Sequence, residues 1–328
     1  MTKVVKPFLL STLLGLSFSD YFLPNSHNID QKDHIVVIAK STQTEHTNVS
    51  SNFGSGTSTE SASNIIEYQR LMQLFSDRQV SKSSFSEVLK SVANQFIGKS
   101  YRERLLDQGE TEKLFISFTE FDCVLFVETV LAFSRNLFSV NPSYEKFVQN
   151  IQEVRYIDGK LDGYCSRLHY FSDWIRDHQK RGIVRDHTEE LGGIPLNKTL
   201  NFMSSHRQKY PRLKHSEANY QCILAMEKRI ELETKSQPLR YIPSHKIHSI
   251  YPSLKSGDII AVVTDIKGLD TTHTGLVYLK PKSTSFIHAS PSVKVKIAPD
   301  LQHYVERVDH AIGIMVARPN LIPQKESI

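Results

Sequence analysis

The chain has 328 residues, of which 39% are hydrophobic and 23% are charged, the composition of a globular protein long enough for one large domain or two small ones. The formal net charge of +5 is spread along the chain, which argues against a nucleic-acid-binding protein with basic residues gathered in a block. The three cysteines stand far apart without a CxxC spacing. Their odd number argues against a disulfide framework and leaves room for one functional thiol, so Cys165 and Cys222 are expected to be small buried residues.

The N-terminal region has the order of a secretory signal. Lys3 and Lys6 precede a short apolar stretch at residues 8–18, which is too short to span a bilayer. We therefore expect residues 1–24 to be a signal peptide, with no stable membrane insertion after its removal and a periplasmic or secreted location. Residues 25–63 are rich in Ser, Thr, Asn and Gly, which predicts a polar linker or partly ordered tail, with one apolar piece at 35–39 that could add a strand.

Helical patterns come next along the chain. Apolar residues recur at helical spacing over 65–75 and 85–96, and Ser84 and Glu87 form the pattern of a capping box at the start of the second helix. Residues 123–137 are so apolar that this helix is expected to be buried. Residues 141–240 read as an insertion of short helices and polar loops, including a helix at 168–177.

The C-terminal third changes to short β-rich segments separated by turn residues. These segments cover residues 259–263, 274–279, 285–289, 293–297 and 312–317. Short strands in succession indicate an antiparallel sheet. Helices first and strands after them predict an α+β domain over residues 64–320.

Cys123 opens the apolar helix. Thr119 or Asp122 can cap this helix, which places the thiol in the first turn. The unsatisfied N–H groups and the helix dipole there favour an anion, so the pKa of the thiol should fall toward the thiolate form. The same N–H groups can hold the oxyanion of a tetrahedral intermediate. Cys123 is therefore a candidate nucleophile.

Two histidines of the predicted sheet are candidate partners for that thiol. His273 begins one strand and His288 lies on the next, and neighbouring antiparallel strands can bring such side chains together. One imidazole would act as general base and acid, and the other would hold it in the required tautomer. Which histidine has which role stays open at this point.

Several motifs together resemble one known family. Residues 97–101 (Ile-Gly-Lys-Ser-Tyr), 121–123 (Phe-Asp-Cys), 254–260 and 273–275 (His-Thr-Gly) follow the motif order of the NlpC/P60 peptidoglycan hydrolases. Residues 121–129, 166–174, 256–261 and 288–290 resemble more closely the DUF1460 branch, the N-acetylmuramoyl-L-alanine amidase-like proteins. The resemblance covers roughly residues 65–318. It implies a papain-like NlpC/P60 fold in which N-terminal helices pack on a C-terminal antiparallel sheet, with helical insertions.

The resemblance also implies roles for individual residues. Cys123 matches the nucleophile, His273 the base and His288 the third polar residue of the family. The residues expected to bind substrate are Tyr101, Asp122, Arg167, His169 and Tyr170. The chain departs from the broader family at Ser100, where Pro is usual, and at Val124, where Ser is usual.

The implied activity is cleavage of the N-acetylmuramoyl–L-alanine amide of muropeptides through a cysteine thioester, without a metal or organic cofactor. One alternative is cleavage between D-Glu and a diamino acid, as in the general family. A non-catalytic wall-binding protein is another. A metal-dependent amidase is a third, since His245 and His248 lie close together, although no HExxH or Cys/His zinc spacing is present.

Overall fold

The computed structural model describes residues 62–76, 80–291 and 294–321. The expected signal peptide, the polar tail and the strand at 35–39 lie outside these residues. Among the described residues, no helix is long and apolar enough to cross a membrane.

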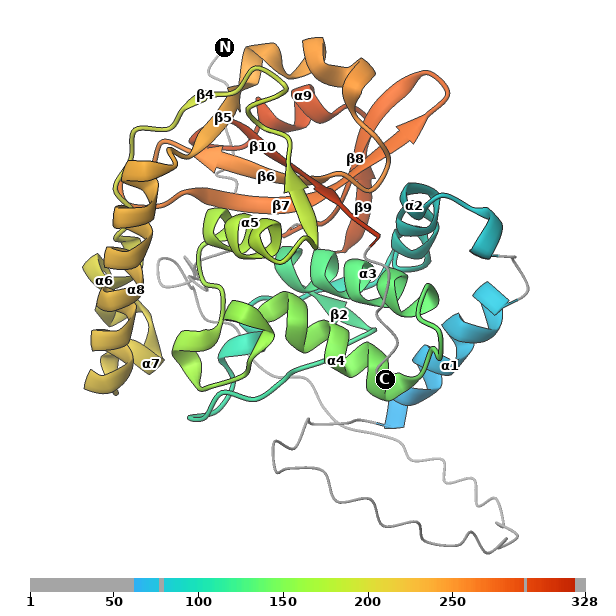
Figure 1. Ribbon diagram of the computed structural model, residues 1–328, viewed down its shortest axis with the longest axis horizontal. Helices are drawn as coiled ribbons and strands as arrows, with labels where there is room; N and C mark the ends of the chain where they lie inside the picture. Colours follow the sequence, from blue (N-terminus) through green and yellow to red (C-terminus); the bar gives the residue numbers. More distant parts are fainter. Residues whose placement is uncertain (1–61, 77–79, 292–293, 322–328) are drawn as a thin grey trace, which may run out of the picture.

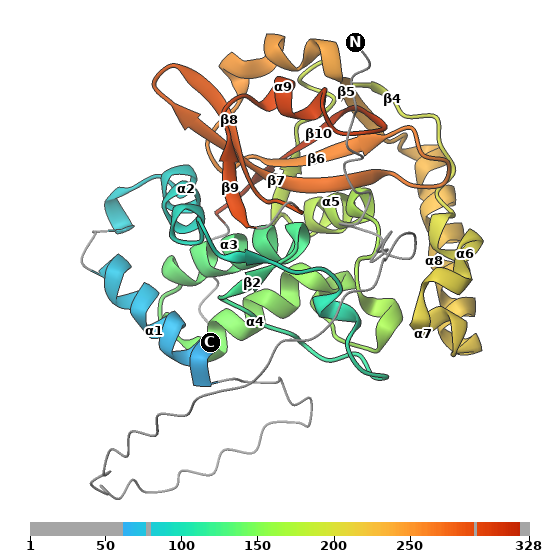
Figure 2. The ribbon, with the colours of Figure 1, turned by 180° about the vertical axis from the view of Figure 1, so that it is seen from behind.

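The helices lie mainly on one side of a large sheet (Figures 1 and 2). They are α1 (Ala62–Ser76), α2 (Phe85–Gln95), α3 (Cys123–Leu137), α4 (Tyr144–Arg155), α5 (Phe171–Lys180), α6 (Phe202–Ser205), α7 (Pro211–Lys214), α8 (Glu217–Ser236) and α9 (Leu301–Val305). The capping box predicted at α2 is present, because the Ser84 hydroxyl accepts from Glu87 N–H and the Glu87 carboxylate accepts from Ser84 N–H. Helix α3 lies at the centre of this layer and is almost completely buried.

The sheet is antiparallel, as predicted, with the order β4-β5-β10-β6-β7-β8-β9, and β3 also pairs with β10. Its strands are β3 (Val184–Asp186), β4 (Ile194–Pro195), β5 (Arg240–Pro243), β6 (Ile259–Thr264), β7 (Thr271–Lys280), β8 (Ser283–Ala289), β9 (Val295–Ala298) and β10 (Ala311–Pro319). A separate two-stranded parallel pair joins β1 (Ser100–Tyr101) to β2 (Glu120–Phe121). The α+β class expected from the order of helices and strands is confirmed.

The two faces of the sheet contact two separate apolar cores. Ile259, Ala261 and Val263 of β6 contribute to the core shared with the helical layer. Ile260 and Val262, which alternate with them, pack instead toward α9 and the 3₁₀ helix η6 (Ser244–Ser253). Strand β6 therefore reads as a continuous apolar run because it is buried on both faces.

The segment predicted as an inserted region contributes more to the sheet than expected. Its residues supply β3, β4 and β5, which extend the sheet on the β10 side. It also contains the 20-residue helix α8, whose polar outer face hid its periodicity. The helix expected at 168–177 begins three residues later, at Phe171, because Arg167 is held in an isolated β-bridge to Tyr156.

The expectation that Cys165 and Cys222 are unpaired buried residues is wrong. They form a disulfide that connects the 3₁₀ turn η4 (Tyr164–Ser166) to α8, with Cα atoms 6.1 Å apart. The odd number of cysteines misled the prediction because the third, Cys123, takes no part in a disulfide. The 57 residues between the paired cysteines gave no indication that η4 and α8 meet.

Candidate active site

The first turn of α3 holds Cys123 at the interface between the helices and the sheet. Asp122 is the N-cap, and its carboxylate oxygen Oδ1 accepts a hydrogen bond from Leu125 N–H at 2.8 Å. Cys123 is the next residue and its side chain is completely buried. Because α3 packs against β7 and β8, its N-terminus lies next to the two strands that carry the candidate histidines.

The two histidines contact each other directly. His273 Nε2 lies 2.7 Å from His288 Nδ1, and both imidazoles are buried. Strands β7 and β8 pair antiparallel with Leu276 opposite Ile287, and this register places the two rings on the same face. Burial lowers the pKa of His273 to about 3 and the pKa of His288 well below its usual range, so both imidazoles are neutral at rest.

The two ring nitrogens outside the His273–His288 contact decide which histidine can act as the base. Within the described part of the chain, His273 Nδ1 and His288 Nε2 make no hydrogen bond. A neutral imidazole has one N–H donor and one acceptor. If His273 Nε2–H donates to His288 Nδ1, then His273 Nδ1 is an unprotonated nitrogen that can accept a proton. In this tautomer His273 is the base and His288 orients it.

Tyr304 is a site residue that the sequence analysis did not identify. Its hydroxyl lies 3.4 Å from His288 Nδ1, and its ring centroid lies 4.6 Å from that of His288 and 5.9 Å from that of His273. Burial raises the pKa of Tyr304, and its electrostatic interaction with the nearby Cys123 raises it further. The phenol therefore stays protonated and has the thiol and both imidazoles around it. Its position on α9, after the last of the motifs, gave no signal in the sequence.

The low pKa of His273 predicts an acid-sensitive fold. Below pH 6.5 the unfolded chain binds a proton at this histidine, whereas the folded chain does not until the pH nears 3. The stability that His273 contributes is therefore present above pH 6.5 and is lost as the pH falls, by about 2 to 3 kcal/mol at pH 4.5. Urea unfolding at pH 7 and 4.5 should show a smaller acid-induced loss for the His273→Gln protein than for the unaltered one. Equal losses in the two proteins would contradict the assignment.

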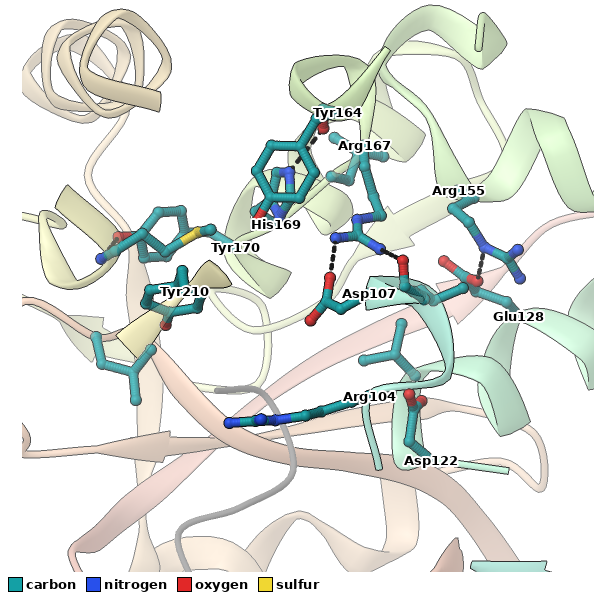
Figure 3. A pocket seen from close by; sticks show the side chains of 15 residues that line it. Arg104, Asp107, Asp122, Glu128, Arg155, Tyr164, Arg167, His169, Tyr170 and Tyr210 are labelled. Carbon is teal, nitrogen blue, oxygen red and sulfur yellow. Dashed lines mark hydrogen bonds and ion pairs between the residues drawn. The ribbon is translucent and has the colours of Figure 1, made fainter. Parts of the chain in front are cut away.

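A cavity of about 90 Å³ lies at the N-terminal end of α3 (Figure 3). Asp122 and Val124, which flank Cys123, line it, and so do three of the predicted substrate-binding residues, Arg167, His169 and Tyr170. Burial is the main cause that raises the pKa of Asp122 to about 7. The structure thus brings four of the five predicted substrate-binding residues to one cavity, although Cys123, His273 and His288 do not line it.

The fifth predicted residue, Tyr101, lies on β1, away from the residues that line this cavity. It pairs with Phe121 in the short parallel β1–β2 pair, two residues before Cys123. Its ring is partly buried against the main core. Tyr101 does not line the cavity that contains the other four.

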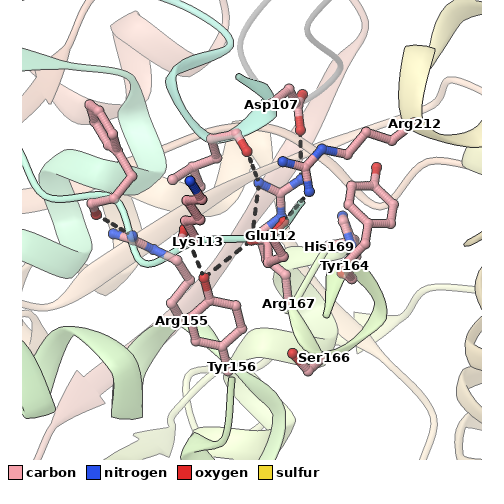
Figure 4. A network of polar contacts seen from close by, with 12 residues as sticks. Asp107, Glu112, Lys113, Arg155, Tyr156, Tyr164, Ser166, Arg167, His169 and Arg212 are labelled. Atoms are coloured by element: carbon pink, nitrogen blue, oxygen red, sulfur yellow. Dashed lines mark hydrogen bonds and ion pairs between the residues drawn. The ribbon is translucent and has the colours of Figure 1, made fainter. Parts of the chain in front are cut away.

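Arg167, one of the predicted substrate-binding residues, is only 6% exposed. Its guanidinium donates to Asp107 Oδ1 at 2.6 Å and to the Leu106 carbonyl at 2.8 Å, and it lies 3.8 Å from Glu112. Figure 4 shows it inside a network of charged side chains. Glu112 also accepts from Arg212. Arg167 therefore shapes the wall of the cavity with most of its hydrogen-bonding capacity already used.

His169 and Tyr170 are likewise held in place. His169 Nε2 donates to the Tyr164 carbonyl at 2.8 Å, which leaves Nδ1 as an acceptor. Burial, with the nearby Arg167 charge as a second cause, lowers the pKa of His169 to about 3, so the ring is neutral. The Tyr170 hydroxyl donates to Glu227 at 2.7 Å and accepts from Met203 N–H at 3.1 Å. Among the residues that the structure describes, His169 Nδ1 makes no hydrogen bond, whereas the Tyr170 hydroxyl makes two.

The described residues contain no group of three or more His, Cys, Asp or Glu side chains arranged to hold a metal ion. His245 and His248, which the sequence raised as candidate ligands, lie on η6.

Comparisons with known proteins bear on this site. A family model described as N-acetylmuramoyl-L-alanine amidase-like (AmiA-like) matches residues 91–314, more than half of the chain. The structure of an N-acetylmuramoyl-L-alanine amidase from Bacteroides uniformis ATCC 8492 is 32% identical, with a TM-score of 0.65, over 72% of this chain and 99% of that one. A Bacteroides fragilis structure described as a proposed xylanase is 33% identical, with a TM-score of 0.65, over 70% of this chain and 99% of that one.

A more distant structure shares the fold. It is a Legionella pneumophila protein of the DUF1460 family, 21% identical, with a TM-score of 0.57, over 79% of this chain and 93% of that one. A search of proteins with curated functions found no match. The family match spans Cys123, His273 and His288. The chain belongs to the N-acetylmuramoyl-L-alanine amidase-like family, and at the level of that family it is a peptidoglycan amidase.

Proposed function

We propose that the chain hydrolyses the amide between N-acetylmuramic acid and L-alanine through a thioester on Cys123, in a papain-like arrangement of the NlpC/P60 type. The observation that carries the proposal is the His273–His288 contact of 2.7 Å beside the N-terminus of α3, with His273 Nδ1 left to accept a proton. The proposed substrate bond follows the description of the Bacteroides uniformis relative, an N-acetylmuramoyl-L-alanine amidase. Its chemistry suits a buried thiol, because an unstrained amide needs a strong nucleophile and a proton for its leaving nitrogen.

Acylation uses the thiolate and the imidazolium together. His273 Nδ1 takes the Cys123 proton, and the sulfur attacks the lactyl carbonyl carbon to form a C–S bond. First-turn N–H groups of α3 and the helix dipole stabilise the oxyanion. His273 then gives its proton to the alanine nitrogen, the C–N bond breaks, and the peptide leaves as an amine.

Deacylation reverses these roles with water in place of the amine. His273 accepts a proton from water as the oxygen attacks the thioester carbonyl. The C–S bond breaks, the muramyl lactic acid leaves, and the proton returns to the sulfur. His288 accepts from His273 Nε2–H throughout, so the imidazolium formed in each step is stabilised without a change of tautomer.

We also propose that the protein works outside the cytoplasm on muropeptides, after removal of residues 1–24. The Cys165–Cys222 disulfide supports this, because disulfides persist in oxidising compartments and are rare in the cytosol.

The proposal is tested with defined muropeptides and product identification by mass spectrometry. The unaltered protein should release a peptide with L-alanine at its N-terminus and leave the sugar intact, and the Cys123→Ala protein should not. Cleavage after D-Glu would keep the thiol chemistry and move the substrate to that of the general family. Activity that survives Cys123→Ala, or hydrolysis of xylan in place of muropeptides, would overturn the proposal.

A further inference from the structure

Arg104 stands out on the wall of the cavity at the N-terminal end of α3. Its backbone is left-handed, with φ 59° and ψ 23°, a conformation that costs energy for a residue other than Gly, Asn or Asp. Its side chain is exposed, and its guanidinium makes no hydrogen bond or ion pair with any described residue. The arginines around it differ, since Arg102 pairs with Glu120 and Arg167 pairs with Asp107. In the view of Figure 3, the Arg104 side chain extends across the cavity between Asp122 and Tyr210.

A second cavity, of about 320 Å³, continues from the first. Arg104, Asp107 and Tyr210 line both, so the two adjoin and form one groove that begins at Asp122 and Val124, the sequence neighbours of Cys123. Lys209 lines the outer cavity, is exposed, and makes no side-chain hydrogen bond or ion pair among the described residues. The outer cavity therefore carries Arg104 and Lys209, neither with a hydrogen bond or ion pair to a described residue, although the Glu103 carboxylate, which also lines it, lies close enough to interact electrostatically with Arg104.

Tyr210 supplies an independent sign that this groove holds a polar ligand. The residue is 94% buried, being 6% exposed, and its hydroxyl is buried without a hydrogen-bond partner in the described part of the chain. An unsatisfied buried hydroxyl is costly, and a ligand acceptor would satisfy it. Burial raises the pKa of Tyr210, so the hydroxyl keeps its proton and can donate.

We propose that this groove binds the carboxylate-bearing stem peptide of the substrate, with Arg104 as the main carboxylate contact, Lys209 as a second cation and Tyr210 as a hydrogen-bond donor. The proposal rests on the proposed function and names the part of the substrate that this side of the site recognises. A guanidinium can bind a carboxylate through two parallel hydrogen bonds, which a neutral amide cannot accept in the same way. The groove thus favours acidic stem peptides over amidated ones.

The test compares two substrates that differ only in charge. These are MurNAc–L-Ala–D-Glu and the same compound with both carboxyl groups amidated. We expect the unaltered protein to prefer the acid about tenfold in kcat/KM, the order of magnitude of one charge-assisted hydrogen bond. In Arg104→Gln the ratio of kcat/KM for the acid to kcat/KM for the amidated substrate should fall close to one, mainly because KM for the acid rises. Lys209→Gln should reduce this ratio less, and Arg185→Gln, which removes an exposed arginine of β3 outside both cavities, should leave it unchanged.

Arg104→Gly separates this role from a structural one. Glycine suits the left-handed backbone, so the melting temperature should stay the same or rise while the preference for the acid is lost. An unchanged preference in Arg104→Gln and Arg104→Gly would overturn the proposal and leave the amidase assignment standing.

A binding measurement covers the case in which no substrate is cleaved. Calorimetry with the free dipeptide L-Ala–D-Glu should show weaker binding to Arg104→Gln than to the unaltered protein. If neither muropeptide is cleaved, the proposed function fails, and equal affinities in this measurement would then reject the groove as well.

Discussion

Replacement of His273 with alanine is expected to lower kcat about a thousandfold, within the range that general acid–base catalysis supplies. Nδ1 of His273 makes no hydrogen bond to a described residue, so it can take the Cys123 proton and return it to the leaving amine. His288 touches the reaction only through its 2.7 Å contact with His273 Nε2, so His288→Leu should have a smaller effect. Steady-state kinetics on a muropeptide, with circular dichroism to confirm folding, measures both.

His288→Asn is the matched control for this assignment. Its side-chain carbonyl can accept from His273 Nε2–H as His288 Nδ1 does, so it should retain most of the activity that His288→Leu loses. A larger loss in His288→Leu than in His273→Ala would reverse the two roles. Equal losses in the Asn and Leu variants would show that an acceptor at this position is not what matters.

Replacement of Glu112 with alanine is expected to lower the free energy of unfolding by about 3 to 5 kcal/mol, as breaking a buried ion pair does. The Glu112 carboxylate is 1% exposed and accepts from Arg212 at 2.5 Å and from the Tyr156 hydroxyl at 3.1 Å. Without it, Arg212 and Arg167 would be two buried guanidinium groups with too little negative charge nearby (Figure 4).

An exposed ion pair provides the control for this prediction. Asp158 pairs with Lys180, and their side chains are 52% and 72% exposed. Lys180→Ala, which removes this pair without touching the left-handed backbone at Asp158, should therefore change stability by about 0.5 kcal/mol or less. Urea unfolding of the two variants compares them directly. A loss below about 1 kcal/mol in Glu112→Ala would mean that the network contributes little to the fold.

The sequence predicted the elements whose pattern is local. The apolar helix at 123–137, its N-cap Asp122 and the C-terminal strands follow from periodicity and capping residues, and each appears within a few residues of its expected place. The contact between His273 and His288 was predictable because a short turn joins their strands, which limits how far apart the rings can lie.

The rest depends on contacts between distant segments. Nothing near Tyr304 indicates that α9 returns to the histidines, and nothing near Cys165 indicates that α8 packs against it. Arg167 lies in a polar stretch that resembles a surface, yet Asp107 and Glu112, 55 to 60 residues earlier, make its burial possible. The sequence around Arg104 does not distinguish it from other arginines. Only the structure does, through its left-handed backbone and its lack of a hydrogen bond or ion pair to a described residue.

Detection of the acyl-enzyme tests the central claim most directly. The protein would be mixed with a muropeptide, quenched in acid within milliseconds to seconds, digested and measured by mass spectrometry. Our account predicts a mass increase on the peptide that contains Cys123, equal to the muramyl lactyl group without the stem peptide. Turnover with no acyl group on Cys123 at any quench time, in a protein whose Cys123→Ala variant remains active, would contradict it.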